Sequence, residues 1–536
     1  MRQVERRVRK SGLALAALAA AIWCGPSAAA EERVLHLVTP LEVETLDPHL
    51  RTWAAERIVT TMMLDGLSRE DANGDPVPAG AASWDVSADG RQYVFHLRPG
   101  AEFSDGRKVT ADYFVYAFRR YVDPKTHSQS TGAIESVLHA RDCLSGKLPP
   151  EALGVAATDR LTLTVTLAHP SPFFLHWATL LVPLEREVVE RWGERWTEPG
   201  HMVSNGPFVL ADFHRSGAID LVKNPDYWNA AAIRLDRIKL IPVPDRQAQL
   251  KLLAAGELDA ISLTDEQVAE ERPTLGDQIK IQPVNQIAYY AVNMASGTLA
   301  DQPGVRRALA LTFEPEAIAR KLAAQTTEPA NSLIPRNFPA YAHPRLDFAG
   351  RPMADRLAEA RRLYGEAHYG PERPLAVNLV ERSRKRCQIA ADMWKSALGA
   401  QITCTIIEDE QARFETFQRG DFDMGMISEG AAAPDPLELL ESFQSTPLNY
   451  GNVGRYRSVK FDDLLRDAAS SADFLARADK LARAERLLLE DLPALPLAYA
   501  RAAYLVSPRI KGFRVLPSHG LFVDGVTIEQ DRPRSE

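Results

Sequence analysis

The chain has 536 residues, of which 45% are hydrophobic and 25% are charged, a balance typical of a folded protein. Its formal net charge of −8 argues against a nucleic-acid binder that depends on a basic surface. The one apolar run that resembles a membrane segment, Leu13 to Cys24, is too short to span a bilayer, which excludes a channel or permease.

The first 30 residues predict a cleavable secretory signal. Basic residues between Arg2 and Lys10 precede the apolar run, and a small-residue segment that ends at Ala30 follows it. We expect cleavage after Ala30 and export to the periplasm. Bulky Trp23 stands directly before Cys24, where a lipid-attachment site needs a small residue, so we expect no lipid anchor.

Strand and helix patterns alternate along the rest of the chain. A helix capped by Thr110 is expected to bury Phe114 and Phe118, a second helix ends at Gly256, and a long helical stretch begins near Phe461 and stops before Pro493. This interleaving over some 500 residues predicts an α/β protein with at least two lobes. The predicted strands are Val34–Val38, Tyr93–Leu97, Leu161–Leu167 and Ala260–Leu263.

Neither the cysteines nor any catalytic motif in the sequence indicates a function. Three cysteines remain beyond the signal, which is no disulfide scaffold, although Cys387 and Cys404 would pair if their strands were adjacent. The histidines lack metal-site spacing, and the chain contains no H-E-x-x-H, C-x-x-C, G-x-S-x-G, P-loop or G-x-G-x-x-G motif. We therefore expect neither an enzyme nor a cofactor or metal.

One long segment is more informative. From Ala82 to Tyr113 the chain reads ASWDVSADGRQYVFHLRPG, then FSDG and VTADY, which predicts two strands around an Asp-Gly turn and then a capped helix. This segment resembles the signature of family 5 solute-binding proteins, the periplasmic receptors of peptide-type ABC importers. Further segments agree in order and spacing, among them VSNGPF from Val203 and NPDYWN from Asn224. GERWTEPG from Gly193 is most similar to the oligopeptide-binding proteins.

The resemblance implies a two-lobe α/β periplasmic binding protein fold (type II, of the large class with an extra inserted subdomain) and a hinge between the lobes. It also implies that ligand is enclosed in the cleft as the lobes close, with no catalysis by this chain. The expected domains are a signal peptide at 1–30, lobe I at 31–64, 189–285 and 507–536, the inserted subdomain at 65–188, and lobe II at 286–506.

The resemblance also implies the partners. We expect a peptide or peptide-like solute, an ABC permease and, through it, ATPase subunits at the inner membrane. Nucleic acid is not expected, and the protein is expected to be a monomer.

Several positions match ligand-contacting positions of the family. Trp53 and Ala54 lie in a segment that matches the loop pairing with the peptide backbone, and Tyr116 matches a ligand-contacting tyrosine. Tyr289 lies in the expected crossing region and would line the cleft. The alternatives are an ordinary loop for the first two residues, helix core packing for Tyr116 and strand packing for Tyr289.

The segment from Phe422 to Pro436 departs from the family. Its members usually carry Trp-x-Ala-Asp-Tyr before Pro-Asp-Pro, and in oligopeptide receptors this Asp pairs with the α-ammonium of the ligand. Here Ala432 takes the place of the Asp and Glu429 that of the Trp. Met426 stands where an arginine of the binding wall would be.

We expect Met426, Ser428, Glu429 and Gly430 to belong to the ligand site, with Glu429 as the substitute carboxylate. A buried ammonium without a partner would cost several kcal/mol. The alternatives are that Glu429 is a solvated loop carboxylate, or that the ligand is an opine, a modified peptide or a glycopeptide without a free amine. A secreted hydrolase is the remote alternative. The basic run of Arg382, Arg384, Lys385 and Arg386 lies near the region that faces ligand carboxylates in the family.

Overall fold

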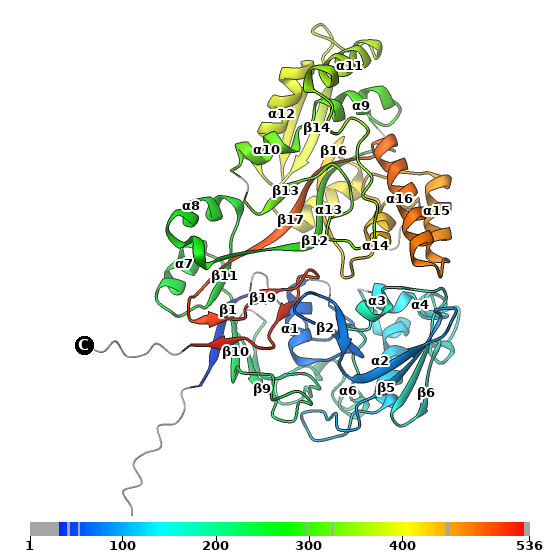
Figure 1. The fold of residues 1–536 in the computed structure, drawn as a ribbon, viewed down its shortest axis with the longest axis vertical. Helices are drawn as coiled ribbons and strands as arrows, with labels where there is room; N and C mark the ends of the chain where they lie inside the picture. The colour runs from blue at the N-terminus through cyan, green and yellow to red at the C-terminus, as the bar shows by residue number, and fades with distance from the viewer. Residues whose placement is uncertain are drawn as a thin grey trace, which may run out of the picture.

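The computed structural model describes residues 32–39, 43–51, 54–129, 131–215, 217–295, 297–323, 325–445 and 451–529. The predicted signal at 1–30 lies outside these residues. The chain forms two lobes that lie one above the other along the longest axis (Figure 1). Lobe I contains the helices from α1 (Ala54–Met63) to α6 (Arg186–Trp192), and lobe II contains those from α9 (Pro303–Thr312) to α16 (Phe474–Asp491). Helix α8 (Asp265–Leu275) lies beside the strands that connect the two lobes.

A large mixed sheet runs through both lobes. Its strands are β1 (Val34–Val38), β8 (Phe208–Phe213), β9 (Ile219–Lys223), β10 (Arg237–Ile241), β11 (Ala260–Ser262), β12 (Ile279–Val292), β13 (Thr327–Pro329), β14 (Ala376–Glu381), β15 (Gln401–Ile406), β16 (Met424–Gly430) and β17 (Ala494–Val506). They follow the order β15-β14-β16-β12-β17-β11-β1-β10-β9-β8, and β13 pairs with β17. The predicted strands at Val34–Val38 and Ala260–Leu263 are confirmed as β1 and β11.

The long strands β12 and β17 carry the chain between the lobes. They pair antiparallel from Ile279 opposite Leu505 to Ala291 opposite Ala494, with a shift of register after Pro283. Proline has no N–H to donate to the ladder, which explains the irregularity at this point. At one end β17 pairs with β11, and at the other end β12 pairs with β16, so the crossing pair is the mechanical link between the two lobes.

Lobe I has a second, antiparallel sheet in the order β4-β5-β7-β6. Its strands are β4 (Ala81–Val86), β5 (Gln92–Leu97), β6 (Val155–Asp159) and β7 (Thr162–Thr166). Alternate residues of β5 and β7 are buried, as their sequence pattern predicted. The helix predicted after Thr110 is α2 (Ala111–Val122), which buries Phe114 and Phe118, but the Thr110 side chain makes no capping hydrogen bond.

Shorter elements complete lobe I. The helices are α3 (Gly132–Glu135), α4 (Ala140–Leu144), α5 (Phe174–Trp177), α6 (Arg186–Trp192) and α7 (Arg246–Ala254). The short strands are β2 (Ser68–Glu70), β3 (Pro76–Pro78), β18 (Ile510–Lys511), β19 (Arg514–Val515), β20 (Leu521–Phe522) and β21 (Thr527–Ile528). The last four return the C-terminal segment to lobe I (Figure 1).

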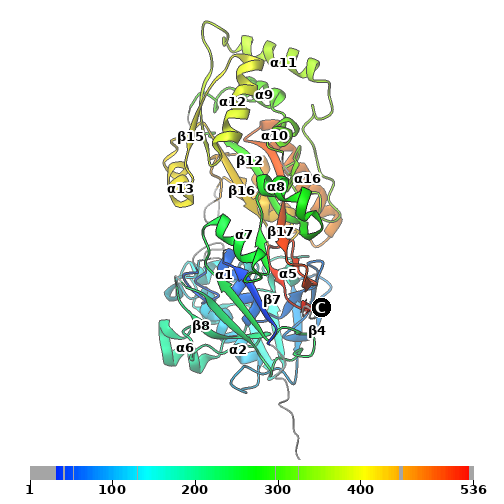
Figure 2. The same ribbon diagram turned by 90° about the vertical axis from the view of Figure 1, so that its left-hand side faces the viewer.

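Helices cover the sheet of lobe II (Figure 2). Those between α9 and α16 are α10 (Pro315–Lys321), α11 (Met353–Glu366), α12 (Arg384–Leu398), α13 (Glu410–Arg419), α14 (Pro436–Leu440) and α15 (Val459–Ala469). The long helical stretch predicted near Phe461 is two helices, α15 and α16. Asp473 starts the second helix, because its carboxylate accepts hydrogen bonds from the N–H groups of Leu475 and Ala476, both at 2.9 Å.

A disulfide joins Cys387 of α12 to Cys404 of β15, with the two Cα atoms 6.0 Å apart. The disulfide that we expected if the strands of Cys387 and Cys404 were adjacent is present, although Cys387 lies on a helix and not on a strand. The remaining described cysteine, Cys143, is free and buried in lobe I.

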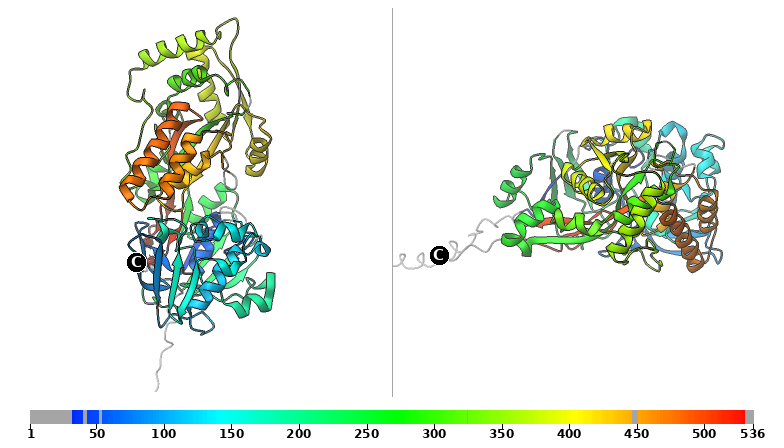
Figure 3. Two further views of the ribbon diagram at one scale, coloured as in Figure 1. Left: turned by 90° about the vertical axis from the view of Figure 1, so that its right-hand side faces the viewer. Right: turned by 90° about the horizontal axis from the view of Figure 1, so that it is seen from above.

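Each lobe has its own hydrophobic core. One large cluster fills lobe I, and two clusters fill lobe II on opposite sides of β12 and β16. The left-hand view of Figure 3 shows the two lobes again as separate bodies, one above the other. None of the helices in the described ranges has the length and apolar character needed to cross a membrane.

Candidate ligand-binding cleft

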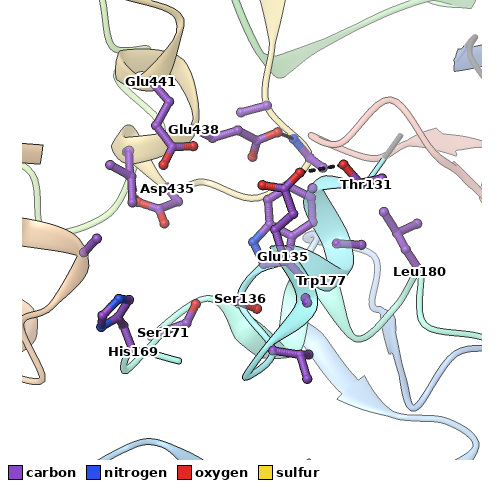
Figure 4. A pocket seen from close by; sticks show the side chains of 18 of the residues that line it. Thr131, Glu135, Ser136, His169, Ser171, Trp177, Leu180, Asp435, Glu438 and Glu441 are labelled. Atoms are coloured by element: carbon purple, nitrogen blue, oxygen red, sulfur yellow. Dashed lines mark hydrogen bonds between the residues drawn. The ribbon is translucent and has the colours of Figure 1, made fainter. Parts of the chain in front are cut away.

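A cavity of about 1790 Å³ lies between the lobes. Lobe I contributes α3, α4 and the loop before α5, whereas lobe II contributes the end of β16, α14 and parts of α15 and α16 (Figure 4). Small-molecule pockets usually measure about 300–1,000 Å³. The cleft therefore has room for a ligand larger than a typical metabolite.

Helix α14 is fixed against the cleft by Asp435. The Asp435 carboxylate caps the helix by accepting a hydrogen bond from the N–H of Leu437 at 3.0 Å. It also accepts two hydrogen bonds from the Arg477 guanidinium of α16, at 2.8 and 2.7 Å. Because Asp435 and Arg477 are almost fully buried, this two-pronged ion pair holds α14 and α16 in a defined relation.

Glu438, one turn into α14, lines the cleft. Its carboxylate accepts hydrogen bonds from the N–H groups of Ala432 and Ala433, at 2.8 and 3.1 Å. Burial raises the pKa of Glu438 to about 8, although the two N–H donors favour the charged form. The Glu438 carboxylate therefore lies beside the backbone of Ala432, whose own side chain is only a methyl group.

Two further glutamates line the cavity, one from each lobe. Glu441, the residue that directly follows α14, faces Glu135 of α3 in the other lobe (Figure 4). Burial, and then the nearby Asp435 carboxylate, raise the pKa of Glu441 to about 7. Glu135 accepts a hydrogen bond from the Thr131 hydroxyl at 2.5 Å and lies 3.4 Å from the Arg141 guanidinium. This part of the cleft favours a positively charged group.

Of the basic run, Arg382 lines the cleft and is exposed there. Lys385 lies 3.7 Å from Glu266 of α8, and Arg386 pairs with buried Glu381 at 3.0 Å. Arg384 is exposed as well, but of the four residues only Arg382 is among the described residues that line the cleft.

The structure places the predicted site residues in different environments. Gly430 lines the cleft. The Glu429 carboxylate is not among the described residues that line it; it accepts hydrogen bonds from the hydroxyl groups of Tyr289, at 2.9 Å, and Ser442. Burial raises the pKa of Glu429 to about 6. Tyr289 itself is buried against Phe443, and the half-buried Glu429 side chain is directed toward it.

The other predicted residues are also outside the described cleft lining. Met426 is buried in the core of lobe II. Ser428 is exposed and accepts a hydrogen bond from the side-chain amide of Gln286, at 2.9 Å, and Gln286 lines the cleft. Tyr116 packs in lobe I with the Arg186 guanidinium 5.8 Å from its ring centre.

Of the two residues predicted to pair with the ligand backbone, Trp53 and Ala54, the structure describes only the second. Trp53 lies outside the described residues, and Ala54 is the first residue of α1. The same helix contributes Arg57 to the cleft. The predicted contact of Trp53 and Ala54 with ligand backbone stays a prediction.

Sequence reasoning missed Glu438 and Glu441. Their spacing of three residues is that of neighbours on one face of a helix, and the Pro-Asp-Pro start predicts where that helix begins. In the structure α14 ends at Leu440, and Glu441 is the first residue of the 3-10 turn that follows it. This signal was present in the sequence, but it becomes informative only once α14 is known to face the other lobe.

The fold and the cleft define a class of protein. Two lobes with separate cores, joined by a crossing strand pair and enclosing a cavity lined by both, form a two-lobe periplasmic binding protein fold. Among the described residues, no group of three or more His, Cys, Asp or Glu side chains is arranged to hold a metal ion.

The chain belongs to the bacterial extracellular solute-binding proteins, family 5, whose model matches residues 75–450. It is 31% identical to the periplasmic oligopeptide-binding protein OppA of Escherichia coli, over 93% of this chain and 92% of that protein. It is also 31% identical to the probable deoxycholate-binding periplasmic protein YgiS of the same organism, over 88% of each chain. The crystal structure of Haemophilus influenzae OppA in complex with the peptide RPPGFSPFR matches with a TM-score of 0.79 and 26% identity, over 93% of this chain and 99% of that one. The family is one of solute-binding proteins, not of enzymes.

Proposed function

We propose that this protein captures peptides in the interlobe cleft and delivers them to the permease of an ABC importer. The observation that carries the proposal is the charge arrangement of the cleft, whose lining includes the carboxylates of Glu438 and Glu441 and the exposed guanidinium of Arg382. These charges complement the ammonium and carboxylate ends of a peptide. The size of the cavity and the names of the OppA relatives support the same ligand class.

Glu438 is the proposed partner of the ligand ammonium. The family position for this role is Ala432, which has no charge, and the Glu438 carboxylate is within hydrogen-bond distance of the Ala432 N–H. A cation arriving beside Glu438 stabilises its charged form. Glu441, directly after the last residue of α14, is a second acidic side chain in the lining of the cleft.

The cellular setting follows from the same proposal. Residues 1–30 act as a cleaved signal that exports the protein to the periplasm without a lipid anchor. There the protein acts as a monomer, without catalysis, and meets a permease whose ATPase subunits supply the energy. The lobes divide at the predicted boundaries, 31–64, 189–285 and 507–536 against 286–506, with the subdomain 65–188 in lobe I. The separate core clusters of the two lobes support this division.

The test is thermal shift and calorimetry with trialanine, N-acetyl-trialanine and deoxycholate. We expect trialanine to raise the melting temperature most, and Glu438→Gln to weaken trialanine binding at least about tenfold, since a buried charged hydrogen bond is lost. N-acetyl-trialanine binding should change far less in this variant.

Glu429→Gln is the matched control, because Glu429 lies on the same wall but points into lobe II. It should leave the preference for trialanine over its acetylated form unchanged. Stabilisation by deoxycholate and by no peptide would overturn the peptide proposal. Equal losses for both peptides in Glu438→Gln would overturn the role of Glu438 alone.

A further inference from the structure

A contact between the lobes lies away from the crossing strands. The ring of Phe173, in the lobe I loop before α5, lies 5.9 Å from the ring of Phe474 at the start of α16, centre to centre. The Arg477 guanidinium of the same helix lies 5.8 Å from the centre of the Phe173 ring. Ring pairs and cation–ring pairs at these separations attract each other.

Each side of this contact is also anchored within its own lobe. On lobe II, the Asp435 carboxylate fixes the Arg477 guanidinium through two hydrogen bonds, at 2.8 and 2.7 Å. On lobe I, Phe173 is only 5% exposed and its ring lies 5.7 Å from that of His176. Little conformational freedom is lost when such prepared groups come together, so most of their attraction is available to hold the lobes.

The contact is also connected to the wall that would hold the ligand. Asp435 holds Arg477 and at the same time caps α14, the helix that carries Glu438 and ends directly before Glu441. Ligand binding on α14 and contact formation at Phe173 therefore share one rigid unit.

We propose that Phe173, Phe474 and Arg477 form a latch that holds a fraction of the ligand-free molecules closed. This inference deepens the proposed function, because it concerns how closure of the same cleft is controlled. When only closed molecules hold ligand fully, the apparent dissociation constant is the intrinsic constant divided by the closed fraction. The latch then scales the affinity for every ligand by the same factor, unlike a ligand-contacting residue.

The direct test measures the distance between the lobes without ligand. Spin labels on Val86→Cys in lobe I and Val459→Cys in lobe II occupy exposed positions, and the remaining free thiol, Cys143, is buried. We expect two distances in the parent protein. Phe173→Ala should lower the ratio of the shorter to the longer distance about tenfold, as expected for a lost cation–ring and ring contact.

Phe474→Ala removes the opposite ring from a half-buried position and so tests the contact without emptying a core. The double variant should be no more open than Phe173→Ala, because both changes break one contact. Trp192→Ala is the control, since this ring stacks on His201 within lobe I, and it should leave the distances unchanged.

Binding assays give the second readout. Phe173→Ala should weaken trialanine and trilysine by the same factor, whereas Glu438→Gln should not affect the ligand-free distances. A single long distance in the parent, or the same distances in the parent and Phe173→Ala, would overturn the latch. If no peptide binds at all, the proposed function fails, but the distance measurement still decides the latch.

Discussion

A carboxylate that is buried in the ligand-free cleft changes its charge when a cation arrives. Burial raises the pKa of Glu438 to about 8 and that of Glu441 to about 7, so Glu438 is mostly protonated at neutral pH. An ammonium group beside Glu438 favours the ionised form and lowers its pKa. If Glu438 binds the ligand ammonium as proposed, we expect peptide binding to be coupled to loss of a proton.

Calorimetry at pH 6.5 in buffers of different ionisation enthalpy should reveal this coupling. The α-amino group of trialanine is already protonated at this pH, because its pKa is near 8. We expect the complex to release close to one proton per peptide, and Glu438→Gln to reduce the release by at least half. The same release in both proteins would show that another group loses the proton.

At the scale of elements, one buried carboxylate fastens α16 to the segment that contains residues 332–341. Glu485 is fully buried and accepts hydrogen bonds from the Ser332 hydroxyl at 2.6 Å, the Leu333 N–H at 2.7 Å and the Tyr341 hydroxyl at 2.9 Å. Burial raises its pKa from 4.5 to about 7. Between these values the folded state binds more protons than the unfolded state. The contribution of Glu485 to stability is thus full below about pH 4.5 and is lost as the pH rises through about 7.

Glu485→Gln should weaken the dependence of protein stability on pH, since the amide stays neutral at every pH. We expect the fall in melting temperature between pH 5 and pH 8 to be smaller in the variant than in the parent. Glu490→Gln, an exposed position on the same helix, is the control and should follow the parent curve. If the melting temperatures of the parent and Glu485→Gln fell equally with pH, Glu485 would not be the source of the pH dependence.

The disulfide between α12 and β15 closes a short loop at the edge of lobe II. Its cysteines are 17 residues apart, and cross-linking a loop of this length stabilises a protein by about 3 kcal/mol in the chain-entropy model. Replacing both Cys387 and Cys404 by Ser should lower the unfolding free energy by roughly this amount, measured by urea denaturation. Trialanine affinity should not change, because neither residue lines the cleft. Reductant should destabilise the parent and leave the double variant unaffected.

At the scale of the whole molecule, the arrangement of cores permits a hinge. Each lobe buries its own apolar side chains, and β12 and β17 link the two bodies. Bending at this link changes the cleft without opening either core. Ligand contacts from both lobes exist together only when the cleft is closed, so a ligand shifts the population toward that state.

Small-angle X-ray scattering should detect this shift. Saturating trialanine should lower the radius of gyration of the parent protein, whereas the same concentration should have less effect on Glu438→Gln, which stays partly unliganded. Identical scattering curves with and without trialanine, under conditions where calorimetry confirms binding, would contradict closure on the ligand.

Much of the fold was accessible from the sequence. The alternation in Tyr93–Leu97 and Leu161–Leu167 predicted β5 and β7, and the segment from Ala82 to Tyr113 indicated the family. These signals are local, because the periodic direction of side chains along a strand or helix involves only residues close together in the sequence. The sequence by itself also determined that Ala432 carries no charge.

Only the tertiary structure shows which carboxylate lies beside Ala432 in the cleft. Successive residues of a strand point to opposite faces, but the sequence does not say which face meets the cleft. Pairing of β16 with β12 turns Glu429 toward Tyr289 inside lobe II, and the Asp435–Arg477 ion pair turns α14 so that Glu438 lines the cavity. The physical reason is that the lining of an interlobe cleft is set by contacts between segments far apart in the chain, which no local pattern encodes.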